Sequence, residues 1–176
     1  YYRNRFLRNI NKINQLLDEK SNYTKKEILN ALQSSTNFYL HYQGKNDLKL
    51  QTKYAQLIER LTKKIYPQFH RKRKKNISHK YLKIGFISSY FKNHSVSKGL
   101  KNWIIKLDKN LFKTFVYYVG NTIDQTTNLI KENSNYFYNH TSVDSMINKL
   151  NDDNLDIIIF TDIGMNPKIQ ILCSLR

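Results

Sequence analysis

The chain has 176 residues, of which 40% are hydrophobic and 24% are charged. This composition supports a globular core and excludes a generally disordered protein, while the length excludes a large enzyme with two full domains. The single cysteine, Cys173, excludes an internal disulfide and a metal site built from several cysteines.

The net charge of +17 is distributed unevenly along the chain. Residues 1–80 contain 19 Lys and Arg against 5 Asp and Glu, whereas residues 81–176 contain 11 against 8. A strongly basic half is typical of proteins that bind nucleic acid. The sequence is also rich in Asn, Lys, Ile, Tyr and Phe, which an AT-biased genome favours without selection for a polyanion. A basic nucleic-acid-binding module with an α/β scaffold is therefore kept as the alternative, and nucleic acid is not the expected partner.

Three helices are predicted in the first 66 residues. Apolar residues recur at spacings of three and four between Phe6 and Leu17, which is the pattern of an amphipathic helix. A second helix is expected after a cap at Asn22 or Thr24, and a third begins near residue 46 or 47 and stops at Pro67. We expect these helices to form a cap for another unit.

Residues 70–80 include five consecutive basic residues, Arg71 to Lys75. Such a run can contact phosphate or nucleic acid, or it can be a solvated linker. A linker is favoured because no aromatic residue is interleaved among the charges to stack on bases. We therefore expect a boundary near residue 79, between a helical region with a basic tail (1–79) and an α/β region (80–176).

After residue 80 the pattern changes to strands alternating with helices. Strands are predicted at about 82–88, 112–119 and 155–161, with a short extended piece at 136–138, and helices at about 96–107, 122–134 and 144–150. The helix after the first strand is expected to turn Leu100, Trp103, Ile104 and Leu107 inward.

The strand at 155–161 is apolar on both faces, which is typical of a central parallel strand covered by helices. Strands separated by helices imply right-handed βαβ units. The predicted fold class is therefore α/β: a helical segment followed by an incomplete Rossmann-like parallel sheet.

Polar side chains follow the first and last predicted strands. These residues are Ser88, Ser89, Asn93, His94 and Ser95 in one loop and Thr161, Asp162, Gly164 and Met165 in the other. Ligands of open α/β sheets bind at the carboxyl ends of the strands, so both loops should face one crevice. A histidine there can act as a general base or bind a sugar or phosphate oxygen, although a single histidine more often caps a helix. An Asp after a strand also commonly makes a turn.

Common nucleotide and hydrolase motifs are not found in the sequence. The first predicted loop has no GxGxxG, which disfavours a nicotinamide or flavin site of the usual kind. The sequence also has no P-loop, no HExxH and no nucleophile elbow.

Four segments resemble the O-GlcNAc transferase family, including its bacterial SPINDLY-type members. They are KIGFISSYFKNHSVSKGL at 83–100, FKTFVYYVG at 112–120, LDIIIFTDIGMNPKIQILCSLR at 155–176 and, for the helical part that precedes the catalytic region, SSTNFYLHYQGKNDLKLQTKYAQL at 34–57. In the family a histidine of the first loop, followed by Pro-Thr or Ser-Val, lies at the active-site cleft. Here that histidine is His94, followed by Ser95 and Val96.

The resemblance implies an inverting glycosyltransferase of GT-B architecture. Such an enzyme would move N-acetylglucosamine or another hexose from a UDP-sugar to a polypeptide acceptor, without a metal or other cofactor. His94 is then the candidate catalytic residue. The candidate cleft and substrate-binding residues are Ser89, Asn93, Ser95, Val96, Asp162, Gly164 and Met165.

The resemblance covers only the first half of the catalytic region. We therefore expect the sequence to be a fragment whose donor-binding half follows residue 176, and expect the fragment alone to be inactive. No apolar run approaches the length of a membrane span and no signal peptide is visible, so a cytoplasmic protein without a membrane partner is expected.

Overall fold

The computed structural model describes residues 1–19, 22–70 and 80–175. It divides the chain into two compact units. We call Tyr1–Lys72 with Cys173–Arg176 the helical unit and Arg73–Leu172 the sheet unit. The basic run at 71–75 and the predicted boundary at residue 79 lie outside the described residues.

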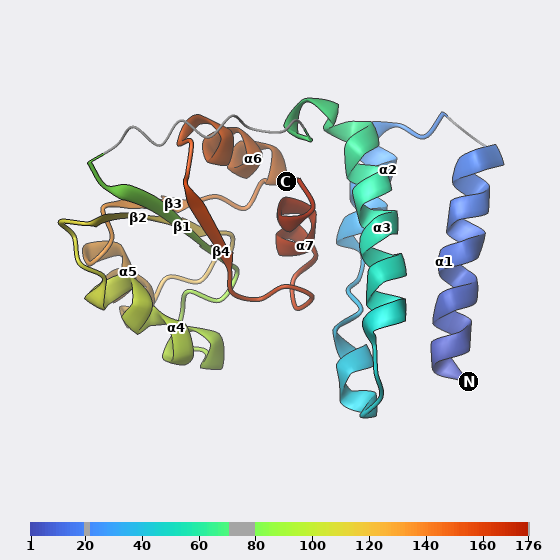
Figure 1. Cartoon of the computed structure of the whole chain (residues 1–176), viewed down its shortest axis with the longest axis horizontal. Coiled ribbons are helices and arrows are strands. Elements are labelled where there is room, and N and C mark those ends of the chain that lie inside the picture. Colours follow the sequence, from blue (N-terminus) through green and yellow to red (C-terminus); the bar gives the residue numbers. More distant parts are fainter. Residues whose placement is uncertain (20–21, 71–79, 176) are drawn as a thin grey trace. The chain divides into compact units, whose positions relative to one another are not determined.

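The helical unit contains the three predicted helices, joined by shorter turns (Figure 1). Its elements are α1 (Tyr2–Glu19), α2 (Lys25–Gln33), the 3-10 turn η1 (Phe38–Gln43), α3 (Leu48–Ile65) and the 3-10 turn η2 (Pro67–Phe69). The predicted cap of α2 is confirmed at Thr24. Its hydroxyl accepts from the Glu27 backbone N–H at 3.2 Å, and the Glu27 carboxylate accepts from the Thr24 backbone N–H at 2.8 Å.

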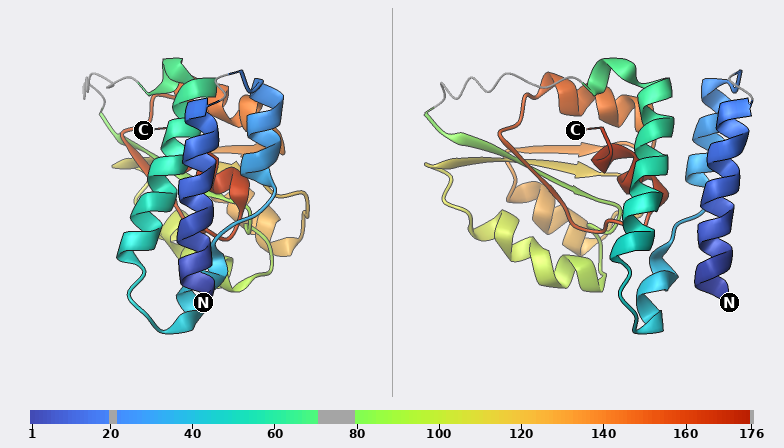
Figure 2. Two further views of the ribbon diagram at one scale, coloured as in Figure 1. Left: turned by 90° about the vertical axis from the view of Figure 1, so that its right-hand side faces the viewer. Right: turned by 45° about the vertical axis from the view of Figure 1, so that its right-hand side comes forward.

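Ion pairs at both ends hold α1 parallel to α3 (Figure 2). Arg3 binds Asp47 directly before α3, and Arg60 Nη2 lies 2.5 Å from Asp18 Oδ1 near the other end of both helices. Apolar side chains from all three helices form the core between them, because each helix has one apolar face. The buried members include Ile10, Ile28, Leu32, Leu57, Ile58 and Leu61.

In its described residues, the sheet unit has four parallel strands in the order β3-β2-β1-β4. The strands are β1 (Leu82–Ser88), β2 (Phe112–Tyr118), β3 (Tyr136–Asn139) and β4 (Ile157–Phe160). The helices are α4 (Ser95–Lys106), α5 (Gln125–Glu132), α6 (Val143–Asp152) and α7 (Pro167–Cys173), and the last residue of α7, Cys173, is counted with the helical unit. Helices followed by a parallel sheet are the predicted arrangement, so the α/β fold class is confirmed.

Helices cover both faces of this sheet (Figure 1). On one face, Phe86 of β1 and Val116 of β2 pack against Ile104 of α4 and Ile130 of α5. Figure 1 shows α6 on the opposite face. This two-sided cover is why the strands are apolar on both sides.

Two expectations about packing were wrong in detail. Trp103 was expected to face inward with Ile104, but its side chain is 57% exposed whereas Ile104 is fully buried. Successive helical residues point about 100° apart, and here α4 is turned so that Ile104, rather than Trp103, faces the sheet. The strand at 155–161 was expected to be central, yet β4 lies at one end of the sheet among the described strands. Ile157 is 43% exposed and the other β4 residues are half-buried, so an apolar strand sequence did not report strand order here.

No helix in the described ranges combines the length and apolar character needed to cross a membrane.

Candidate functional site

The loops after β1 and β4 meet at the carboxyl edge of the sheet. Because β4 pairs directly with β1, Thr161 continues the ladder by donating its backbone N–H to the Ile87 carbonyl at 3.2 Å. The two predicted polar clusters therefore lie side by side. Strand order decides this, since residues 73 positions apart in the sequence become neighbours.

Asp162 fastens the two loops together. Its carboxylate oxygen Oδ2 accepts the Ser89 backbone N–H at 3.2 Å and the Ser89 hydroxyl at a shorter distance, while Oδ1 accepts the Thr161 hydroxyl at 3.1 Å. The Asp162 residue is only 2% exposed. Burial raises the pKa of this carboxyl, and the hydrogen bonds from Ser89, Ser88 and Thr161 oppose the rise. A buried carboxylate with these donors holds the β1 loop at a defined position.

His94 caps α4 with its ring. The residue has extended backbone angles, and its Nδ1 accepts the backbone N–H of Val96 at 3.2 Å. An Nδ1 that accepts a hydrogen bond carries no proton, so the proton of the neutral ring lies on Nε2. The tautomer assigned in this way presents a hydrogen-bond donor at Nε2.

Tyr90 supports the His94 ring from one side. The two rings are stacked, with centroids 4.2 Å apart and planes at 26°. Burial raises the pKa of the Tyr90 phenol, with a further contribution from the charge of Asp162. Asp162 and His94 are thus connected through Ser89 and Tyr90. Within the described residues, no direct hydrogen bond joins Asp162 to His94.

Asp124 ties the β1 loop to α5. One of its carboxylate oxygens accepts the Asn93 backbone N–H at 2.6 Å, and the other caps α5 by accepting the Thr127 backbone N–H at 3.0 Å. These two N–H donors, Asn93 first, lower the pKa of the Asp124 carboxyl. The loop is therefore held from β4 on one side and from α5 on the other.

The remaining predicted site residues lie around this network with differing exposure. Ser95 is exposed at the start of α4, and Val96 is half-buried with its N–H already given to His94. Gly164 is buried with φ 86°, a left-handed conformation that favours glycine, and Met165 is half-buried. The Met165 backbone N–H donates to the Asp162 carbonyl at 3.1 Å, which closes a turn below the carboxylate.

Sequence reasoning missed Tyr90 and Asp124. Asp124 stands three residues before Thr127, and both reciprocal bonds of a capping box are present. That spacing was a usable signal for the cap, although not for its second bond to Asn93. Tyr90 had no local signal, because its stacking on His94 depends on the path of the loop.

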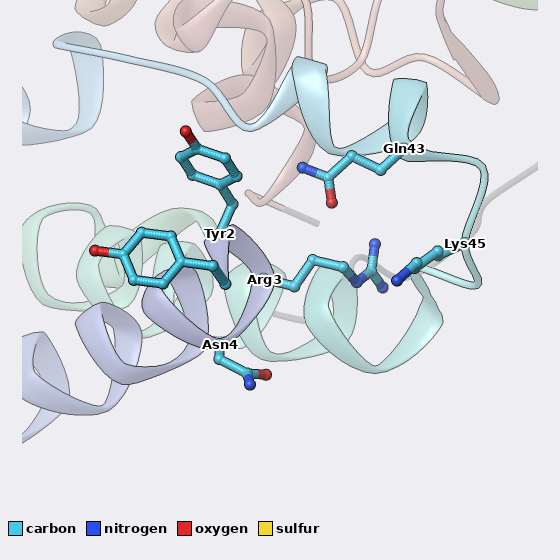
Figure 3. Close-up of a pocket in the computed structure, with 6 residues that line it drawn as sticks. Tyr2, Arg3, Asn4, Gln43 and Lys45 are labelled. Atoms are coloured by element: carbon cyan, nitrogen blue, oxygen red, sulfur yellow. The ribbon is translucent and has the colours of Figure 1, made fainter.

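A separate pocket of about 520 Å³ lies in the helical unit (Figure 3). Figure 3 shows Tyr2, Arg3 and Asn4 of α1 on one side and Gln43 and Lys45 on the other. Arg3 already binds the Asp47 carboxylate and the Asn46 carbonyl oxygen. The cationic side chain of Arg3 in this pocket is therefore used in a structural ion pair. None of the residues that line the pocket belongs to the network around Asp162.

The fold and the carboxyl-edge loops define an α/β protein with a Rossmann-like sheet. No known family and no curated protein matches the chain by sequence. A solved structure of a mutant O-GlcNAc transferase from Thermobaculum terrenum is similar in fold, with a TM-score of 0.59 and 14% sequence identity. The alignment covers 97% of this chain and 32% of that protein, so the chain spans about a third of its length. At this identity the likeness concerns the fold.

Proposed function

We propose that residues 80–176 are the first Rossmann-like half of the catalytic region of an inverting GT-B glycosyltransferase, with residues 1–79 as a helical cap or linker region. The donor would be a UDP-sugar carrying N-acetylglucosamine or another hexose, used without a metal, and the acceptor would be a polypeptide. The observation that carries the proposal is the joining of the β1 and β4 loops by Asp162, beside His94 at the start of α4. The fold likeness to a bacterial O-GlcNAc transferase supports it. The nucleic-acid alternative has no comparable support.

The proposed reaction is a single displacement. The acceptor hydroxyl or amide attacks the anomeric carbon, the bond from that carbon to the diphosphate oxygen breaks, and the acceptor proton passes to a base. The enzyme must bind the acceptor in line and stabilise the charge that grows on the diphosphate. Ligand binding at the carboxyl edge of a parallel sheet fits this arrangement.

His94 fits the charge-stabilising role better than the general-base role. With Nδ1 accepting from Val96, its Nε2–H would donate to an oxygen of the leaving diphosphate or of the acceptor. Acting as a base at Nε2 would require the other tautomer, which would break the cap. The backbone N–H groups of Ser95 and Ser97 at the same helix start are proposed as further phosphate donors.

The test is a transfer assay on the whole protein as isolated from its own cells, because a first half by itself is expected to be inactive. Wild type should move labelled hexose from a UDP-sugar onto polypeptides. His94→Asn retains a good helix cap, so the fold should persist while transfer falls about 100-fold, the usual loss for one such donor. Absence of hexose transfer by wild type would refute the proposed function. Wild-type turnover by His94→Asn would remove His94 from the mechanism.

A further inference from the structure

A groove of about 330 Å³ lies on the sheet face that α6 covers, near the amino ends of the strands. It is far along each strand from the Asp162 network, because Lys83 and Lys113 stand at the second positions of β1 and β2. The wall includes Lys149 and Asp152 of α6, and the rim includes Tyr81. All of its lining residues belong to the sheet unit.

The groove offers an aromatic surface to a ligand. Phe115 of β2 and Tyr136 of β3 are aligned in register and stack with centroids 4.5 Å apart and planes at 23°. Phe115 is buried, whereas Tyr136 is 43% exposed on β3, which lies at one edge of the described sheet. The Tyr136 ring therefore has one face against Phe115 and another that Phe115 does not cover. Such a ring is a stacking surface for a planar group.

Three ammonium groups line the same groove. Lys83 and Lys113 are register partners on adjacent strands, where like charges repel each other. Lys113 Nζ lies 4.1 Å from the centroid of the Tyr81 ring. Lys83 Nζ donates to the Asp153 carbonyl at 3.2 Å, and Lys149 Nζ lies 2.9 Å from an Asp153 carboxylate oxygen. Lys149 Nζ also lies 4.3 Å from the centroid of the Tyr138 ring, so it is engaged on two sides. An ammonium carries three N–H donors, so Lys83 and Lys113 retain donors for an anion.

Two carboxylates, those of Asp152 and Asp153, also line the groove and only partly offset the positive charge of the three lysines. Asp153 is engaged by Lys149 and by the Tyr117 hydroxyl, which donates to Oδ2 at 2.5 Å. Asp152 is exposed at the end of α6. With three lysines and two aspartates, the lining has a formal net charge of +1. A bound anion would relieve the repulsion between Lys83 and Lys113.

We propose that this groove binds a small planar molecule that carries an anionic group, of the chemical class of a nucleoside monophosphate. The ring stacks on Tyr136, and the phosphate binds the ammonium groups of Lys113 and Lys83. The volume lies at the lower end of the range for ligand sites, which suits one such molecule. This site is independent of the proposed transferase site, which lies at the opposite ends of the strands.

The test is calorimetric titration of the chain with adenosine monophosphate, adenosine and inorganic phosphate. Adenosine monophosphate should bind at least tenfold more tightly than adenosine or phosphate, because only it uses both the ring and the ammonium groups. Lys113→Met and Tyr136→Ala should each weaken its binding about tenfold. Asp152→Asn should strengthen it severalfold, since it removes a repelling charge.

Matched controls separate this site from general effects. Lys131→Met removes an exposed charge on α5, and Tyr39→Ala removes an exposed ring in the helical unit. Each control should bind adenosine monophosphate as wild type does. The proposal is overturned if adenosine monophosphate does not bind at millimolar concentration, if Lys113→Met and Tyr136→Ala bind it unchanged, or if Asp152→Asn weakens it.

Discussion

The two ends of the sheet are built from different interactions. At the carboxyl edge, a carboxylate in a residue that is 2% exposed accepts hydrogen bonds from loops of two strands. At the amino end, stacked rings and lysines lie in an open groove, and Tyr136 is 43% exposed. A buried polar network is costly to break, whereas exposed groups can change with little loss of stability. The carboxyl edge should therefore be rigid and sensitive to substitution, and the groove tolerant of it.

The largest effect is expected at Asp162. Asp162→Ala leaves the Ser89 backbone N–H and the Ser89 hydroxyl without their buried acceptor, whereas the Thr161 hydroxyl keeps the Ile87 carbonyl at 3.4 Å. We expect the free energy of unfolding of the sheet unit to fall by about 3 kcal/mol. Urea unfolding followed by fluorescence measures it, because the only tryptophan, Trp103, lies on α4. A loss below about 1 kcal/mol would contradict a rigid edge.

The contribution of Asp162 to the free energy of unfolding should also depend on pH. Burial raises the pKa of its carboxyl in the folded state, so this group favours folding most below the pKa of the unfolded chain, about 3.9. Its contribution falls as pH rises through the folded pKa. Asp162→Asn keeps an acceptor for Ser89 and does not ionise, so its stability relative to wild type should improve as pH rises from about 4 to 7. A relative stability that does not change over this range would contradict the burial argument.

The next effect is expected at Asp124. Asp124→Ala removes the cap of α5 and the acceptor for the Asn93 N–H, and should cost about 1.5 kcal/mol at pH 7. Because these donors lower the pKa of the carboxyl, its contribution is present above the unfolded value near 3.9 and is lost as pH falls through the folded pKa. Unfolding curves at pH 7 and pH 2 should show the difference from wild type shrinking in acid. An equal difference at both pH values would exclude this electrostatic origin.

A smaller effect is expected at His94. His94→Ala removes the cap on the Val96 N–H and should lower the unfolding free energy by about 1 kcal/mol. His94→Asn restores a good capping side chain and should unfold close to wild type. If both variants were equally unstable, the stacking on Tyr90 rather than the cap would be the larger contribution.

The smallest effect is expected in the groove. Tyr136→Ala loses one face of the stack with Phe115 and should change the unfolding free energy by about 0.5 kcal/mol. Tyr136→Phe keeps the stack and is the matched control. A loss as large as that of Asp162→Ala would remove the contrast between the two ends of the sheet.

The sequence predicted local features well wherever the signal was local. The Thr24 cap, the three helices of the first unit and the strands at 82–88 and 112–119 follow from periodicity and capping residues near each element. The error at Trp103 arose because Trp103 and Ile104 are consecutive, and periodicity alone did not say which of them faces the sheet. The expected roles of the site residues stay predictions.

The sequence by itself determined that the polar loops would gather at one edge, because the carboxyl ends of parallel strands all point the same way. Only the tertiary structure decided which loops touch. Pairing of β4 with β1 brings Asp162 to Ser89, and the register of β1 with β2 sets Lys83 beside Lys113. The physical reason is that strand order and register depend on packing between distant segments, which local periodicity does not encode.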